Sequence, residues 1–307
     1  MLQYVSRRLL QAIPVLLGVS FVVFSMLHLV PGDPVLIMLQ GSQATSEQIT
    51  SLRHQLGLDR PFLVQYGQYL WDLAHGDLGT SYRMRMPVLT LVASQFGSTL
   101  QLTLASLLLA VGLGLSLGIV AAYNRDTSVD SISMGISIFG VSVPNYLLAL
   151  VLILFFSVRL GWFPATGQGG WKRLVLPAVA MGWGYAAIIA RLVRQNLVEV
   201  WHQDYVLSAR AKGLAERAIL LRHALKNSLI PTVTIIGLQF GHMMASAVVI
   251  ETVFARQGIG RLIVQAITAK DFPMVQGLVL FTASSYVLAN ILVDISYGYL
   301  DPRIRYE

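Results

Sequence analysis

Long apolar blocks, separated by shorter polar segments, dominate the chain. A membrane-spanning helix needs about 20 mostly apolar residues to cross the hydrocarbon core, and six blocks meet that requirement. They cover residues 9–30, 99–122, 132–158, 174–190, 229–250 and 274–300. The fourth is short and runs into a polar stretch at Arg191. The pattern predicts an all-α, polytopic membrane protein with six transmembrane helices in a single domain over residues 1–307.

The first block shares a basic start and an apolar run with a secretory signal peptide. It is longer than the apolar region of such a peptide, and no small-residue cleavage site follows it. It ends instead at the rigid sequence Pro-Gly-Asp-Pro over 31–34. We therefore expect a retained membrane span.

The segment 31–97, between the first two spans, predicts a small extracytoplasmic subdomain. Thr45 can open a helix that runs to Leu56 and stops at Gly57. A second amphipathic stretch covers 61–74, and its aromatic residues suit packing at the membrane surface: Phe62, Tyr66, Tyr69 and Trp71.

Composition supports the membrane assignment. Hydrophobic residues make up 55% of the chain and charged residues 12%, whereas soluble domains carry about 25% charged residues. If both termini are cytoplasmic, the segments on the cytoplasmic side carry about twice the density of basic residues found in the outer segments. This excess favours that topology in a bacterial inner membrane. The net charge of +7 therefore indicates topology and lipid contact. Nucleic acid is not expected, because no basic stripe interleaves with aromatic residues.

The usual signatures of catalysis and metal binding are missing from the sequence. It has no G-x-x-x-x-G-K-[ST] and no H-E-x-x-H, and its six histidines show no ligand spacing. The run Gly114-Leu115-Ser116-Leu117-Gly118 matches G-x-S-x-G only inside a predicted span, and a nucleophile elbow needs a turn from a strand into a helix. With no cysteine, disulfides and thiolate metal sites are excluded. We predict no catalytic residue, no metal and no cofactor in this chain, so any ATP hydrolysis requires another chain.

Polar residues within apolar spans are costly and are therefore candidates for function. In the fifth predicted span Gln239 and His242 lie three residues apart, with Ser246 about one turn further on. In the third, Pro144 and Asn145 would loosen the helix. These five residues are candidates for lining a translocation pathway. A helix–helix hydrogen bond explains Gln239 and His242 equally well, and Pro144 can equally be an inert kink.

Other residues in the spans have simpler interpretations. Glu251 and Asp294 lie near span ends, where snorkelling or pairing is sufficient. Glycines recur at the G-x-x-x-G spacing that lets helices approach closely, at 114 and 118 and at 237 and 241, and Gly182 and Gly184 add a further patch without a side chain. They favour a tight helical bundle.

The segment 191–228 is the longest predicted cytoplasmic connection. A short helix over 201–213 ends at Gly213, and a second helix over 216–227 leads into the fifth span. A helix followed by a glycine turn on the inner face suits docking to a soluble partner, although an ordinary amphipathic surface helix would look the same.

Two runs in this connection carry a family resemblance: Asp204-Tyr205-Val206-Leu207-Ser208-Ala209-Arg210-Ala211-Lys212-Gly213-Leu214 and Leu221-Arg222-His223-Ala224-Leu225-Lys226-Asn227-Ser228-Leu229-Ile230-Pro231. They resemble the coupling segment of permease subunits of bacterial peptide/nickel ABC importers. Further motifs typical of that family follow in order along the chain, at 31–34, 55–59, 76–79, 161–164, 254, 258–261, 271–273 and 301–306.

The resemblance implies the fold of a type I ABC importer permease. It implies an assembly with a second homologous permease, two cytoplasmic ATPase subunits that bind ATP and Mg²⁺, and an extracytoplasmic substrate-binding protein. It further implies that the ATPase contacts a defined set of residues: Tyr205, Ser208, Ala209, Arg210, Ala211, Lys212, Gly213 and Leu214.

The chain departs from the broader importer pattern at two positions. Leu207 stands where a glutamate often opens the coupling motif, and Lys226 where a proline often closes it, with Pro231 following. Peptide-type permeases commonly share these departures. They put in doubt any salt bridge that the family assigns to that glutamate.

Substrate and transport class leave alternatives open. The family resemblance covers dipeptides, oligopeptides, glutathione, opines and nickel or nickel chelates, of which peptides are favoured. A proton-coupled secondary transporter would show inverted repeats and a mid-span acid, and neither is evident. A membrane-embedded hydrolase lacks a paired nucleophile and base.

Overall fold

The computed structural model describes residues 2–29, 34–39 and 45–300. Positions 30–33 and 301–306 lie outside them; they hold the last residue of the first predicted span and two family-like motifs. The described residues form helices and no strand: α1 (Leu2–Leu29), α2 (Pro34–Met38), α3 (Ser46–Gln55), α4 (Phe62–Ala74), α5 (Val88–Tyr123), α6 (Ser128–Ser142), α7 (Asn145–Leu152), the π-helical η1 (Ile153–Arg159), α8 (Lys172–Val200), α9 (Asp204–Ala211), α10 (Glu216–Ile219), the π-helical η2 (Leu220–Ala224), α11 (Leu225–Val253), α12 (Ile259–Thr268) and α13 (Phe272–Leu300).

Helices long and apolar enough to cross a membrane match five of the six predicted spans. Within the described residues these are α1, α5, α8, α11 and α13. Helix α8 extends well beyond the predicted boundary at 190, because its polar end packs at the bundle's edge.

The third predicted span is present as two helical parts and not as one continuous helix. Helix α6 and the unit α7–η1 meet at a bend of 103°. Val143 has extended backbone angles and Pro144 precedes the first residue of α7. Proline has no N–H to continue the helix and disfavours helical angles in the residue before it. The two halves count as a sixth span only if the bent pair is taken together.

The centre of the bundle is the contact between α5 and α8. A Cβ on Gly114 would lie 2.6 Å from Ile189 Cβ, and one on Gly118 would lie 2.6 Å from the carbonyl oxygen of Ala190. On α8, a Cβ on Gly182 would lie 2.7 Å from the Ser106 carbonyl oxygen. Small residues let two backbones approach closely in lipid. This confirms that these glycines belong to helix packing.

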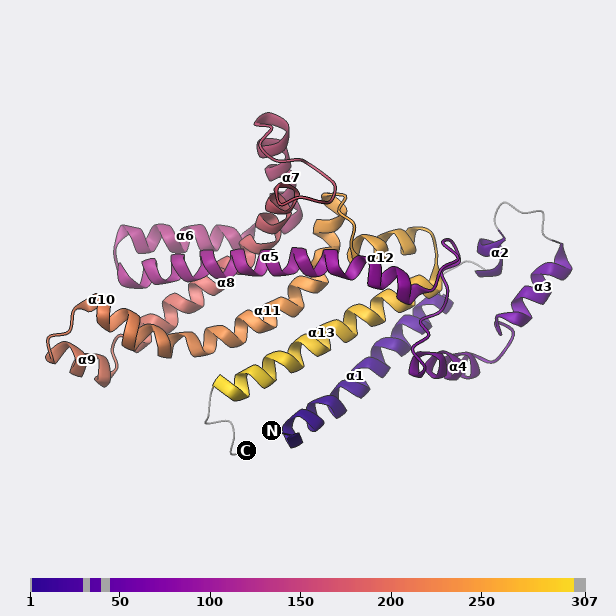
Figure 1. Ribbon diagram of the computed structural model, residues 1–307, viewed down its shortest axis with the longest axis horizontal. Coiled ribbons are helices and arrows are strands. Elements are labelled where there is room, and N and C mark those ends of the chain that lie inside the picture. Colours follow the sequence, from indigo (N-terminus) through magenta and orange to yellow (C-terminus); the bar gives the residue numbers. More distant parts are fainter. Residues whose placement is uncertain (1, 30–33, 40–44, 301–307) are drawn as a thin grey trace.

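Helices α11, α6 and α13 are arranged around this pair. Helix α11 packs on α5 and α8 through a buried core that includes Met243 and Ala247. Its other neighbour is α13, where a Cβ on Gly241 would lie 2.8 Å from the Tyr286 ring. Helix α1 packs on α13 at the edge of the bundle (Figure 1).

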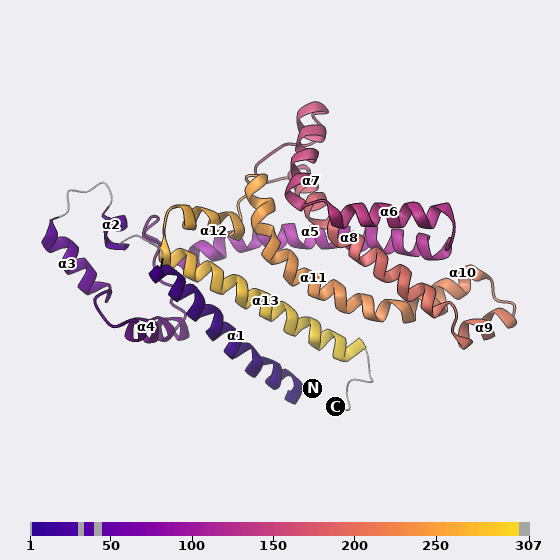
Figure 2. The same ribbon diagram turned by 180° about the vertical axis from the view of Figure 1, so that it is seen from behind.

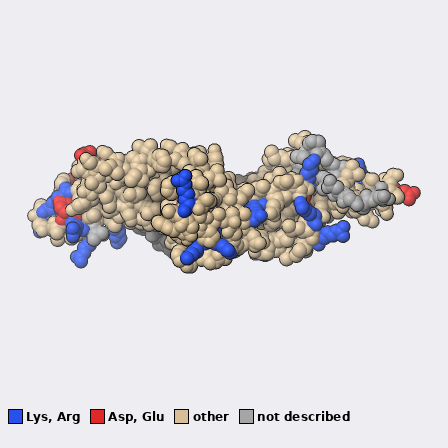
Figure 3. Space-filling view, turned by 90° about the horizontal axis from the view of Figure 1, so that it is seen from above, with Lys and Arg blue, Asp and Glu red and all other residues tan. Residues whose placement is uncertain are grey.

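The two ends of the elongated molecule differ. One end, here the hairpin end, carries residues 201–224 with α9 and α10; the other, the cap end, carries residues 45–87 and 254–272 (Figures 1 and 2). On the face shown in Figure 3 most of the surface between the ends is uncharged, although several Lys and Arg side chains lie along it, and acidic side chains are visible near both ends. A mostly uncharged middle suits a protein that lies in lipid.

The cap forms much as predicted. Thr45 and Gln48 make a capping box at the start of α3. Three of the four predicted surface aromatics pack instead on the cap end of α1, where their rings contact Phe21 and Phe24: Phe62, Tyr66 and Tyr69. Of the four, Trp71 is the one left mostly exposed.

Asp271 ties the cap to the start of α13. Its carboxylate is buried and accepts hydrogen bonds from Ser81 Oγ at 2.5 Å, from Tyr82 N at 3.1 Å and from Arg83 N at 3.3 Å. It also accepts from Met274 N at 3.4 Å in the first turn of α13. Burial, with a smaller effect of the Asp271 charge, raises the pKa of Tyr82 to about 12, so its phenol stays neutral.

We expect Gly118→Leu to separate α5 from α8. Overpacking typically costs about 1–3 kcal/mol, and here the nearest atom is backbone that cannot rotate away. The variant should insert into membranes but unfold at a lower temperature in detergent. Gly112→Leu, on the same helix, is the matched control, because a Cβ added there would have nothing within 4 Å. Equal unfolding temperatures for the two variants would contradict the assignment.

Candidate functional site

Helix α9 ends in a specific turn. Gly213 N donates to Arg210 O at 2.8 Å and Leu214 N donates to Ala209 O at 3.3 Å. This pair of bonds is a Schellman motif, in which the residue after the cap takes a left-handed conformation. Gly213 has φ +75°, which glycine adopts without the steric cost of a Cβ. The predicted stop at Gly213 is confirmed.

One side of α9 is buried in the hairpin. Val206 and Ala209 pack with Ile219 of α10 and with Val200 at the end of α8. Ala209, a predicted contact residue, is therefore part of the hairpin's own core. Arg210 is also engaged within the hairpin: its Nε donates to Glu216 Oε1 at 2.8 Å and its guanidinium lies 5.3 Å from the centre of the Trp201 ring.

The other side of α9 is exposed and forms what we call the docking face. It consists of Tyr205, Leu207, Ser208, Ala211, Lys212 and Leu214. Five of these were predicted from the sequence. Leu207 was not predicted as a contact residue, because in the sequence it stood out only as a departure from the family pattern. Its side chain is 51% exposed. An exposed leucine on a polar hairpin is the signal that could have identified it.

The hairpin is attached to three of the long helices. Leu197 of α8, Leu220 and Ala224 form a small buried cluster that also contacts Ile119 and Ala122 of α5. Asn227 Nδ2, near the start of α11, donates to Tyr205 OH at 3.0 Å. The hairpin thus contacts α5 and α8 through Leu220 and Ala224, and α9 contacts α11 through Tyr205.

An ion pair fixes α6 to α8 in the part of the bundle nearer the hairpin. Arg194 Nε and Nη2 donate to the two Asp130 carboxylate oxygens, each at 2.6 Å. Asp130 is only 5% exposed, and it also accepts from Asp126 N at 3.2 Å. Such bidentate, charge-assisted pairs fix geometry as well as charge.

The predicted pathway residues do not form one cluster. Gln239 is buried, and neither polar atom of its amide has a hydrogen-bond partner among the described residues. His242 is exposed beside the Tyr286 ring, and Ser246 Oγ lies 3.3 Å from Tyr185 OH. Gln239 and His242 therefore lie in different environments, although three residues separate them.

Pro144 and Asn145 occupy the break between α6 and α7. Asn145 lies beside α8, since its Oδ1 would be 3.6 Å from a Cβ on Gly184. The break thus faces the central helix α8 and is separate from the docking face.

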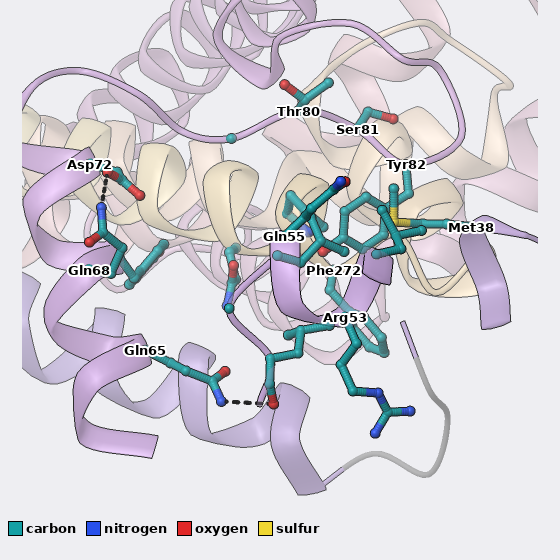
Figure 4. Close-up of a pocket in the computed structure, with 18 of the residues that line it drawn as sticks. Met38, Arg53, Gln55, Gln65, Gln68, Asp72, Thr80, Ser81, Tyr82 and Phe272 are labelled. Atoms are coloured by element: carbon teal, nitrogen blue, oxygen red, sulfur yellow. Dashed lines mark hydrogen bonds between the residues drawn. The ribbon is translucent and has the colours of Figure 1, made fainter. Parts of the chain in front are cut away.

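A cavity of about 1250 Å³ opens at the cap end. It lies between α3, α4, the 77–85 loop and the start of α13, and none of the predicted site residues lines it. Asp72 and Arg53 lie on opposite sides of it, with Gln55 and Phe272 between them (Figure 4). Burial raises the pKa of Tyr69, in its wall, to about 12. No group of His, Asp or Glu suited to a metal ion occurs among the residues described.

Comparisons with known proteins identify the family. "Binding-protein-dependent transport system inner membrane component" matches residues 114–306, and its N-terminal companion family matches residues 1–103. The chain is 40% identical, over the full length of both proteins, to "Dipeptide transport system permease protein DppB" of Alkalihalophilus pseudofirmus. It is 41% identical, again over full lengths, to "Glutathione transport system permease protein GsiC" of Escherichia coli (strain K12).

A solved structure shares the fold. An inward-facing structure of the MetNI methionine ABC transporter matches 69% of this chain and 97% of its own, with a TM-score of 0.58 and 20% identity. The resemblance found in the sequence is thereby confirmed, including the fold of an ABC importer permease. The chain belongs to the family of inner-membrane permease components of binding-protein-dependent transport systems.

Proposed function

We propose that this chain is half of the translocation pathway of an ATP-driven importer of di- and oligopeptides. A second, homologous permease supplies the other half, and an extracytoplasmic binding protein delivers the peptide. Two ATPase subunits bind ATP and Mg²⁺ in the cytoplasm; this chain contributes no catalytic residue and binds no cofactor. The names of the full-length relatives support a peptide, since dipeptides and glutathione are both small peptides.

The docking face of α9 is the observation that carries the coupling role. It presents Leu207 and Leu214 to solvent on a hairpin that is anchored to α5, α8 and α11. Exposed apolar side chains with a polar rim are typical of a protein-binding surface. We infer that the ATPase covers this face, and that its ATP-driven movement shifts the equilibrium between two arrangements of the spans.

The proposal fixes an orientation. The hairpin end and both termini lie in the cytoplasm, in agreement with the excess of basic residues there. The cap end then faces outward, and its cavity opens on the side where the binding protein docks.

Nickel is the less favoured cargo. Met243 and Met244 are buried in the helix core, whereas His242 is exposed. The three side chains therefore do not form a single donor set. His242 remains a candidate pathway residue with Ser246, and Gln239 requires a different helix arrangement to reach that side.

Gly213→Val should uncouple ATP hydrolysis from uptake. The left-handed conformation costs roughly 1–2 kcal/mol in other residues, and nothing lies within 4 Å of the added Cβ, so the effect is conformational. ATP turnover per peptide imported, measured in proteoliposomes, should rise. Gly213→Asn should restore coupling, because asparagine tolerates this conformation. Gly76→Val carries the same strain at the cap end and should leave the ratio unchanged; undiminished coupling in Gly213→Val would refute the role of the turn.

Leu207→Glu and Leu214→Glu together should reduce capture of the ATPase by the affinity-purified permease. A charged group in place of an apolar anchor leaves a desolvated charge in the interface. Leu56→Glu, a comparably exposed leucine at the cap end, is the matched control. If all variants captured the same amount of ATPase, the docking face would lie elsewhere.

Substrate class can be tested by competition. In cells that express the complete system, unlabelled dipeptides and tripeptides should inhibit uptake of a radiolabelled dipeptide. Nickel salts or nickel–histidine complexes should not, because no donor set for a metal was found in the described part of this chain. Labelled nickel accumulation that peptides fail to inhibit would reverse the assignment.

A further inference from the structure

Glu251 is a fully buried acid at the cap end of α11. Its exposure is 0%, so of the two sequence-based explanations snorkelling is excluded and pairing remains; the side chain of Asp294 lies outside the described part of the structure. Glu251 Oε2 accepts from Gly260 N at 2.8 Å and from Arg261 N at 3.2 Å. These are the free N–H groups of the first turn of α12, which a carboxylate satisfies well.

Thr99 of α5 completes the arrangement. Its hydroxyl donates to Glu251 Oε1 at 2.6 Å and accepts from Ile259 N at 2.9 Å. One carboxylate and one hydroxyl therefore join three helices, α5, α11 and α12, within a space closed to solvent. We call Glu251, Thr99 and the N–H groups of residues 259–261 the carboxylate clamp.

The glycines of the 258–261 motif make room for the clamp. A Cβ on Gly258 would clash with the Glu251 carboxylate, and a Cβ on Gly260 would clash with the backbone of Val248. The motif was noted in the sequence as a family feature without a role. Its physical role is to let the start of α12 approach α11 closely enough for direct hydrogen bonds.

Neighbouring contacts strengthen the same junction. Ser98 Oγ donates to Gln257 O at 2.5 Å, and Arg256 Nη2 donates to Gln101 Oε1 at 2.8 Å. Arg256 is 2% exposed. The turn between α11 and α12 is therefore held by Ser98, Thr99 and Gln101, within about one turn of α5. Figure 2 shows α12 lying beside α5 and α11 at the cap end.

We propose that Glu251 is a positioning residue that keeps α12 fixed to α5 throughout transport. The cap ends of α5, α11 and α12 then move as one body, and the pathway opens outward along another boundary. This inference rests on the proposed import function, because only a transport cycle requires the cap end to move.

A covalent tether tests the rigid-body claim in the assembled complex. The chain has no cysteine, so Ser98→Cys and Gln257→Cys can be joined by a short bis-methanethiosulfonate reagent once the other subunits are made cysteine-free. We expect peptide uptake to be the same before and after cross-linking. Loss of uptake that a reducing agent restores would overturn the proposal, because α5 and α12 would then have to separate.

Replacement of the acid tests the positioning role. Glu251→Ala in the same cysteine pair should lower uptake by about tenfold or more, since it removes the three hydrogen bonds that Glu251 accepts from Thr99, Gly260 and Arg261, while the ATPase still co-purifies. Cross-linking should restore uptake, and Glu251→Gln, whose amide oxygen can still accept from Gly260 and Arg261, should keep most of it. Failure of the tether to restore uptake would mean that the carboxylate acts by another route. If Glu251→Ala does not assemble, Thr99→Val removes one clamp bond and is tested in the same way.

A measurement without substrate separates this inference from the proposed function. Spin labels at Ser94→Cys on α5 and Thr268→Cys on α12, both exposed positions, should report one unchanged distance with and without ATP. A distance that changes would refute the rigid body, even if uptake proceeds. If the wild-type complex imports no peptide, the proposed function fails, and the label distances still decide whether the clamp holds.

Discussion

The close backbone contact between α5 and α8 is the interaction on which the rest of the structure depends. Lipid gives apolar surfaces little reason to associate, so helices gain stability from close packing instead. Gly114, Gly118 and Gly182 allow that approach. The polar groups along α5 are already satisfied, since Thr103 and Ser106 hydroxyls donate to carbonyls of their own helix. Helices α6, α7 and α11 then pack on α8, which makes this pair the frame that positions both ends.

The two ends are attached to this frame by different chemistry. At the hairpin end the attachment is mainly apolar, through Leu197, Leu220 and Ala224. Apolar contacts are non-directional and tolerate small rotations. At the cap end two buried carboxylates, Glu251 and Asp271, hold neighbouring segments through hydrogen bonds with defined directions. The hairpin end, where a partner would act, can therefore make small adjustments. The helices that meet at the cap end are held in a fixed geometry.

Hydropathy and turn chemistry predicted the elements that depend on local sequence. The long spans follow from apolar length, and the end of α9 follows from Gly213. The sequence indicated a weak point at Pro144 but not the 103° bend there, because hydropathy gives the length of an apolar segment and not its direction. Burial of Ala209 and the engagement of Arg210 by Glu216 depend on how α10 folds back, which no local pattern specifies. The partners of Glu251 could not be identified from the sequence for the same reason: they lie about 150 residues away on α5 and just beyond the next turn.

Unpaired polar groups distinguish α11 from the frame. Among the described residues, buried side-chain atoms without a hydrogen-bond partner include Thr232 Oγ1, Thr234 Oγ1 and both amide atoms of Gln239 on α11, and Asn290 Oδ1 on the adjacent α13. An unpaired polar group costs more in a low-dielectric interior than in water. A helix that carries such groups loses few hydrogen bonds when it shifts, and it can gain some in another arrangement. The packing between α5 and α8 offers no comparable gain, so a rearrangement within the membrane would be least costly in the part of α11 that carries Thr232, Thr234 and Gln239, while the carboxylate clamp holds its cap end to α5.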